Sequence, residues 1–94
     1  MPFELQFLPS ALKEWHKLGE TLRGQFKKKL AERLLNPRVE ADKLCDADLK
    51  DCYKIKLRSA GYRLVYRVDD TTVTVTVVAV GKRERSAVYG AAKR

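Results

Sequence analysis

Basic side chains recur at alternate positions in the second half of the chain and could together hold a phosphate. Residues 51–58 and 62–68 alternate basic with apolar residues, which predicts two strands joined by a turn at residues 59–61. A strand sends successive side chains to opposite faces, so the cations share one face of the hairpin: Lys54, Lys56, Arg58, Arg63 and Arg67. Like charges this close repel one another, and an anionic chain such as a polyphosphate would remove that cost.

The same cations could cleave RNA as well as bind it. Transesterification needs a base for the 2′-hydroxyl, positive charge beside the phosphorane, and a proton or cation for the leaving 5′-oxygen. Lysine can act as a base only if its pKa falls well below about 10.4, and neighbouring cations lower it. Lys54 and Lys56 are placed for that effect, whereas Arg63 stays charged and suits charge stabilisation. The alternative is a passive phosphate-binding sheet that uses the same side chains.

Residues near the C-terminus extend this set. Arg83 follows the last predicted strand, and Tyr89 comes six residues later. A tyrosine ring beside a basic face can stack on an unpaired base, although Tyr89 could equally pack the last helix onto the sheet. Further cations are predicted to contact the RNA backbone: Lys50, Arg58, Arg67, Lys82 and Arg85.

The composition predicts one basic domain, residues 1–94, with a formal net charge of +8. Residues 1–49 carry a net charge of +1 and residues 50–94 carry +7, a concentration typical of nucleic-acid binding proteins. His16, Cys45 and Cys52 do not make a zinc-ligand pattern, so we expect no metal, no cofactor and two free thiols. There is no secretion signal and no apolar run near the ~20 residues that span a bilayer, so we expect a soluble cytoplasmic protein.

The first half of the chain predicts a strand and two helices. The strand covers residues 3–7, and a helix capped by Ser10 follows and ends at Gly19. A second helix, residues 21–35, carries a core stripe at four-residue spacing: Leu22, Phe26, Leu30 and Leu34. Lys27–Lys29 and Arg33 are expected on its solvated outer face, which a large RNA could use as a second contact.

The second half predicts a loop at residues 38–51 with room for one helical turn, then the hairpin, then a third strand. That strand covers residues 72–79, directs Val75, Val77 and Ala79 to one side, and ends at Gly81. A short helix is expected at residues 86–93. The fold class is therefore α+β with the order β-α-α-β-β-β-α, in which two N-terminal helices pack on a small, mainly antiparallel sheet.

Four segments of the chain resemble the RelE family of toxins. They read ALKEWHKLG, FKKKLAERLLNPRVEADKL, CYKIKLRSAGYRLVY and VGKRERSAVY, and the resemblance extends over nearly the whole chain. It implies an mRNA interferase, an endoribonuclease that needs no metal and cuts mRNA in the ribosomal A site. The products would be a 2′,3′-cyclic phosphate and a 5′-hydroxyl, and the implied partner besides mRNA and ribosomal RNA is a RelB-type antitoxin.

The resemblance also implies a role for each matching residue. Lys54 would activate the 2′-hydroxyl, while Lys56 and Arg63 would hold and neutralise the scissile phosphate. Arg83 would act at the leaving oxygen, and Tyr89 would stack on a codon base.

One segment departs from the family pattern. RelE-like chains often have an arginine where this chain has Cys45, and Lys50 is the cation that could replace it. Two other functions compete with the interferase: a ParE-type toxin that poisons DNA gyrase, and a passive RNA- or ribosome-binding module. ParE-like chains generally lack this lysine–arginine set, which favours the interferase.

Overall fold

The computed structural model describes residues 2–44 and 50–82, and these residues form a four-stranded sheet with two helices. The elements are β1 (Glu4–Phe7), α1 (Pro9–Lys17), α2 (Glu20–Leu35), a 3-10 turn η1 (Glu40–Asp42), β2 (Cys52–Leu57), β3 (Tyr62–Asp69) and β4 (Thr74–Lys82). The strand order is β1-β4-β3-β2; β1 is parallel to β4, and the other pairs are antiparallel. The predicted α+β class and element order are confirmed through β4, and the helix predicted at residues 86–93 lies outside the described residues.

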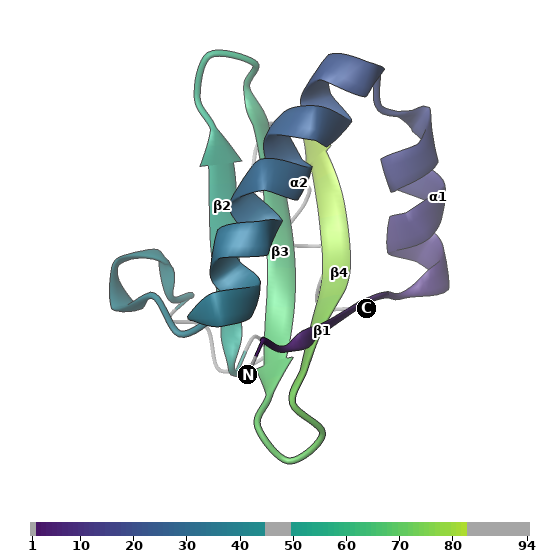
Figure 1. Cartoon of the computed structure of the whole chain (residues 1–94). Coiled ribbons are helices and arrows are strands. Elements are labelled where there is room, and N and C mark those ends of the chain that lie inside the picture. Colours follow the sequence, from purple (N-terminus) through teal and green to yellow (C-terminus); the bar gives the residue numbers. More distant parts are fainter. Residues whose placement is uncertain (1, 45–49, 83–94) are drawn as a thin grey trace.

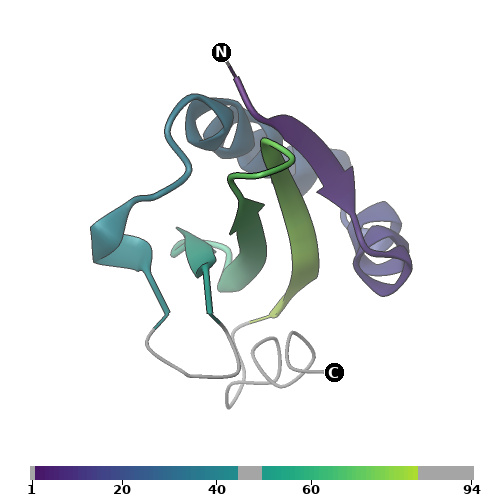
Figure 2. The same ribbon diagram turned by 90° about the horizontal axis from the view of Figure 1, so that it is seen from below.

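Both helices lie on the same side of the twisted sheet (Figures 1 and 2). The helix α1 packs against β4, and α2 packs against β2. This arrangement leaves the β2–β3 hairpin with one face toward α2 and the other face turned away from both helices. No helix in the described part of the chain is both long and apolar enough to cross a membrane.

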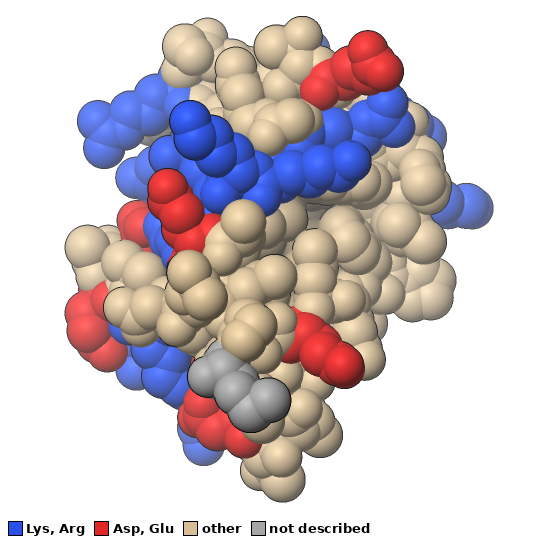
Figure 3. All heavy atoms as spheres, in the orientation of Figure 1, with Lys and Arg blue, Asp and Glu red and all other residues tan. Residues whose placement is uncertain are grey.

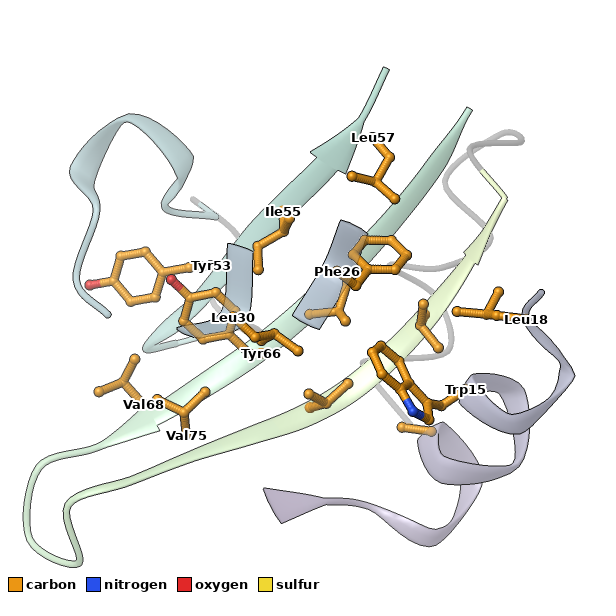
Figure 4. Close-up of a cluster of buried hydrophobic side chains, with 14 residues drawn as sticks. Trp15, Leu18, Phe26, Leu30, Tyr53, Ile55, Leu57, Tyr66, Val68 and Val75 are labelled. Atoms are coloured by element: carbon orange, nitrogen blue, oxygen red, sulfur yellow. The ribbon is translucent and has the colours of Figure 1, made fainter. Parts of the chain in front are cut away.

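The space between helices and sheet is filled by one apolar cluster (Figure 4). Phe26 and Leu30, from the predicted stripe of α2, are fully buried in it. Trp15 of α1 lies between β1 and α2 in this cluster: its ring centroid is 5.2 Å from that of Phe7 and 6.2 Å from that of Phe26. The predicted alternation of the hairpin is confirmed, because its apolar set lies in this cluster: Tyr53, Ile55, Leu57, Leu64, Tyr66 and Val68.

The strand β4 departs from the predicted alternation because it contains a β-bulge. Tyr66 pairs with Val77 while Val65 pairs with Ala79, so β4 has one more residue than β3 at this point. An extra residue reverses the faces of all the side chains beyond it. Ala79, which we expected in the main core, therefore lies in a second cluster with Val65 on the other side of the sheet, and Val80 takes the core position.

The limits of β4 also differ from the prediction. Residues 70–73 form the preceding turn, in which Asp69 Oδ1 accepts hydrogen bonds from the N–H groups of Thr71 and Thr72 at 2.9 and 3.2 Å. The strand then begins at Thr74 rather than residue 72. Gly81 does not end it, because the antiparallel pairing with β3 continues to Lys82.

The helix α1 begins two residues before the predicted start. Pro9 occupies its first turn and Leu8 precedes it without a side-chain cap, so Ser10 is not the cap. Proline suits this position because the first N–H groups of a helix have no intrahelical acceptor. Gly19 does not end α1 but is the residue from which α2 starts.

The prediction for Arg33 on α2 is wrong, because its side chain points inward rather than into solvent. It lies three residues after Leu30 and seven after Phe26, which places it at the edge of the buried helix face. Its guanidinium donates to Tyr66 Oη at 2.8 Å and to Asp42 Oδ2 at 2.5 Å. It also reaches the backbone carbonyl of Lys54 at 3.4 Å, so it joins α2 and η1 to the hairpin.

We expect Phe26→Ala to lower the free energy of unfolding by about 3–5 kcal/mol, because it leaves a cavity under the hairpin. Urea denaturation followed by circular dichroism measures the loss. Leu35→Ala on the same helix is the control: this side chain is 73% exposed, and the change should be within about 0.5 kcal/mol. Similar losses in both variants would contradict this description of the core.

We expect Arg33→Ala to lower the free energy of unfolding by about 2 kcal/mol, because it leaves Asp42 and Tyr66 without the guanidinium that binds them. Arg33→Lys should recover little of this, since an ammonium cannot reproduce the fork of hydrogen bonds. The control is Lys27→Ala, an exposed cation on the same helix. Equal stability of the Arg33 and Lys27 variants in the same denaturation assay would show that the inward network is unimportant.

Candidate functional site

The cations of the hairpin share the sheet face that is turned away from the helices, as the alternation predicted. Lys56 lies directly opposite Arg63, and Lys54 lies directly opposite Val65. Directly opposed residues have Cβ atoms about 4.5–5.5 Å apart, so Lys56 and Arg63 are close neighbours. Arg58 belongs to the turn rather than the strand.

The turn of the hairpin brings Arg58 back beside the strand ends. Gly61 has a φ of 70°, a conformation that favours glycine, and its N–H bonds to the carbonyl of Leu57 at 2.9 Å. A pocket of about 320 Å³ lies here, lined by Lys56, Leu57, Arg58, Gly61, Tyr62 and Arg63. Its volume is at the lower end of the range for small-ligand sites, and three cations converge on it, so it suits a phosphate group.

The electrostatic effect of this crowding appears at Lys56. The charge of Lys54 is the largest cause of a lowered pKa of Lys56, followed by burial, a hydrogen bond with Lys54, and the charges of Arg63 and Arg58. Each of these cations disfavours the protonated ammonium of Lys56. This lowering makes Lys56 a candidate for proton abstraction.

Arg67 shares the face but lies at the opposite end of the hairpin. It is four residues from Arg63 along β3, or about 13 Å at the rise of a strand. It lines a different pocket together with Asp51, Asp69 and Asp70. Of the five predicted cations, three thus line the pocket near the turn, Lys54 lies next to Lys56 along the same face of β2, and Arg67 lies in a separate pocket with Arg38 and three carboxylates.

The remaining predicted RNA contacts lie at both ends of the sheet or beyond it. Lys50 is exposed in the turn before β2, at the Arg67 end. Lys82 is exposed at the pocket end, where it pairs with Tyr62. The other proposed site residues, and the cysteine at the family's arginine position, lie outside the described residues: Cys45, Arg83, Arg85 and Tyr89.

Gly81 is a residue of this site that the sequence reasoning missed. The bulge in β4 places it directly opposite Arg63, on the cationic face. No described atom from outside its immediate chain neighbours lies within 4 Å of the position that a Cβ would occupy at Gly81, so β4 adds no side chain at the position opposite Arg63. The unbroken apolar run from Val77 to Val80 was the available signal, since four apolar residues in a row cannot follow a strict alternation.

Comparison with known proteins agrees with this geometry. Residues 5–87 match the family described as the ParE toxin of the type II toxin-antitoxin system parDE. The mRNA interferase toxin RelE of Escherichia coli is 61% identical over 92 residues, which cover 98% of this chain and 95% of the relative. The chain therefore belongs to the RelE/ParE family of type II toxins, which confirms the resemblance seen in its four segments.

Solved structures of RelE have the same fold. A doubly arginine-substituted variant of E. coli RelE in the free state gives a TM-score of 0.89 at 59% identity, covering 98% of this chain and 95% of the other. In the intact E. coli RelBE toxin-antitoxin complex, a chain with 60% identity gives a TM-score of 0.83, covering 88% of this chain and 99% of the other.

We expect Lys54→Ala to raise the pKa of Lys56, because it removes the largest cause of the lowering. At any pH near the midpoint, a smaller fraction of Lys56 would then be unprotonated. The measurement is a titration of the lysine ¹³Cε resonances by NMR in the free protein. Lys13→Ala, on α1, is the control and should leave the Lys56 midpoint in place; an unchanged midpoint in the Lys54 variant would contradict the proposed coupling.

Proposed function

We propose that this protein is the toxin of a toxin–antitoxin pair and an endoribonuclease that cuts mRNA in the ribosomal A site, thereby inhibiting translation. The observation that carries the proposal is the convergence of Lys56, Arg58 and Arg63 on one pocket, with crowding that lowers the pKa of Lys56. The 61% identity to an mRNA interferase supports the same reaction. Because its substrate is mRNA on ribosomes, we place the activity in the cytoplasm.

The proposed reaction is an intramolecular transesterification. The unprotonated amine of Lys56 takes the proton of the 2′-hydroxyl, and the 2′-oxygen then forms a bond to phosphorus. The bond between phosphorus and the 5′-oxygen breaks, leaving a 2′,3′-cyclic phosphate, and the 5′-oxygen acquires a proton. Arg63 stabilises the phosphorane, since it keeps its charge, and Lys54 both adds positive charge and favours the unprotonated form of Lys56.

The roles at the leaving 5′-oxygen and at the codon base remain predictions. Arg83 would protonate or stabilise the leaving 5′-oxygen, and Tyr89 would stack on a base of the codon. A lysine base crowded by other cations is a modest catalyst. A ribosome that holds the message still would supply the orientation, which can contribute several kcal/mol to the rate.

The partner that would silence the toxin is a RelB-type antitoxin. E. coli RelE has been solved in the intact RelBE complex and with a peptide of the antitoxin RelB, and those RelE chains are 60% and 59% identical to this one. We propose that a related antitoxin binds this protein.

The decisive experiment uses ribosomes programmed with mRNA and an empty A site, followed by primer extension. We expect cuts in register with the A-site codon. Arg63→Ala should lower the single-turnover rate by a factor of about 10²–10³, because it removes charge that acts on the phosphorane, while ribosome binding weakens far less. Lys13→Ala, far from the pocket, is the control and should cut at the parent rate.

The same assay separates the competing functions. Uncut mRNA together with inhibited DNA gyrase would instead indicate a ParE-type activity. This alternative is tested because the matched family is described as the ParE toxin. Uncut mRNA on ribosomes that the protein occupies would identify a passive binding module. An Arg63 variant that cuts at the parent rate would remove Arg63 from the mechanism.

A further inference from the structure

A second groove lies beside the proposed cleavage pocket, between α2 and the turn of the hairpin. Its volume is about 640 Å³, twice that of the pocket. The helix contributes Gln25, Lys28, Lys29 and Glu32, and the hairpin contributes Lys56 and Arg58. None of the helix residues has a part in the proposed reaction.

The groove is strongly basic. Four cations line it against the single carboxylate of Glu32. In the described part of the chain, Lys28 and Lys29 are exposed and neither has an ion-pair partner. Figure 3 shows lysine and arginine atoms in a band across the upper part of the helix-covered face, over α2. Gathered like charges repel one another, so an anionic ligand would relieve a cost that the free protein bears.

The groove and the pocket form one continuous basic surface. Lys56 and Arg58 line both of them. An RNA chain whose phosphate lies in the pocket can therefore continue into the groove and stay in contact with cationic side chains. A single phosphate would leave most of the larger groove empty, whereas a continuing single strand would occupy more of it.

We propose that this groove is a second RNA subsite, which holds the phosphate backbone of the message beyond the cleaved codon. The proposal rests on the proposed function, since it concerns the same substrate, and it assigns Lys28 and Lys29 to affinity rather than to chemistry. Lysine binds phosphate as a point charge, so the contact is independent of base sequence. The message is the favoured occupant because the groove opens directly from the pocket that would cleave it.

The test compares Lys28→Ala/Lys29→Ala with the parent on programmed ribosomes. Two messages are used, one that continues past the A-site codon and one that ends at that codon. On the longer message, we expect the double variant to need about tenfold more protein for half-maximal cleavage. The plot of log affinity against log salt concentration should also become less steep, with its slope smaller by about 1.4. The single-turnover rate at saturating protein should change little, because no group at the reacting phosphate is altered.

On the shorter message, the parent should already show the weaker binding, and the double variant should add no further loss. The control is Lys13→Ala/Lys17→Ala, which removes the same charge from exposed lysines of α1 that do not line the groove. It should stay within about twofold of the parent on both messages, since isolated surface charges contribute little. Thermal unfolding of both double variants should match that of the parent.

Three results would overturn the subsite. They are an unchanged half-saturation on the longer message, an equal loss on both messages, and an equal loss in the control variant. The second would indicate that the lysines contact ribosomal RNA, and the third that only net charge matters. Failure of the proposed function is separate from all three, because the parent protein itself would then leave both messages uncut.

Discussion

The pairing of Tyr53 with Tyr66 sets the register of the hairpin, and the position of every cation in the proposed site depends on it. The two tyrosines are directly opposite each other, with stacked rings 5.7 Å apart. Each hydroxyl is held by an arginine from outside the sheet: Arg33 binds Tyr66 at 2.8 Å, and Arg38 binds Tyr53 at 3.2 Å. A slip of one residue would turn the cations into the apolar core, so this buried pair protects the chemistry on the other face.

The like charges on that face oppose folding, and the molecule limits the cost by keeping them near water. Lys54, Lys56 and Arg63 are half-buried rather than enclosed, while the apolar side chains behind them are almost fully buried. Part of the remaining repulsion appears as the lowered pKa of Lys56. The same crowding that destabilises the free protein thus makes a lysine a better base and prepares a place for a phosphate.

Binding and chemistry occupy adjoining parts of one basic surface. The pocket at the end of the hairpin gathers the groups suited to transesterification, and the groove beside α2 extends the positive surface away from it. Lys56 and Arg58 border both hollows, so one RNA strand could use the two together. An enzyme that depends on a ribosome to orient its substrate gains from such a division, because affinity and rate can then be adjusted by different residues.

The alternation of residue types was enough to predict the α+β class, the core faces of α2 and the hairpin, and the cationic face. These features follow from the periods of 3.6 and 2, which are local properties of a chain. The prediction for β4 was wrong at Ala79 and Gly81, and the prediction for Arg33 was wrong as well. Which residue of Val77–Val80 bulges depends on the pairing with β3, and the direction of Arg33 depends on Tyr66 and Asp42.

The sequence by itself therefore determined which side chains share a face, because neighbours along a strand or helix settle that question. Only the tertiary structure decided which of those side chains meet in one hollow. Arg67 lies on the same face as Lys56 but lines a pocket with three carboxylates, and Lys28 comes from a helix distant in the sequence but lines the same groove as Arg58. The distances between such groups come from packing between segments far apart in the chain, which no local pattern encodes.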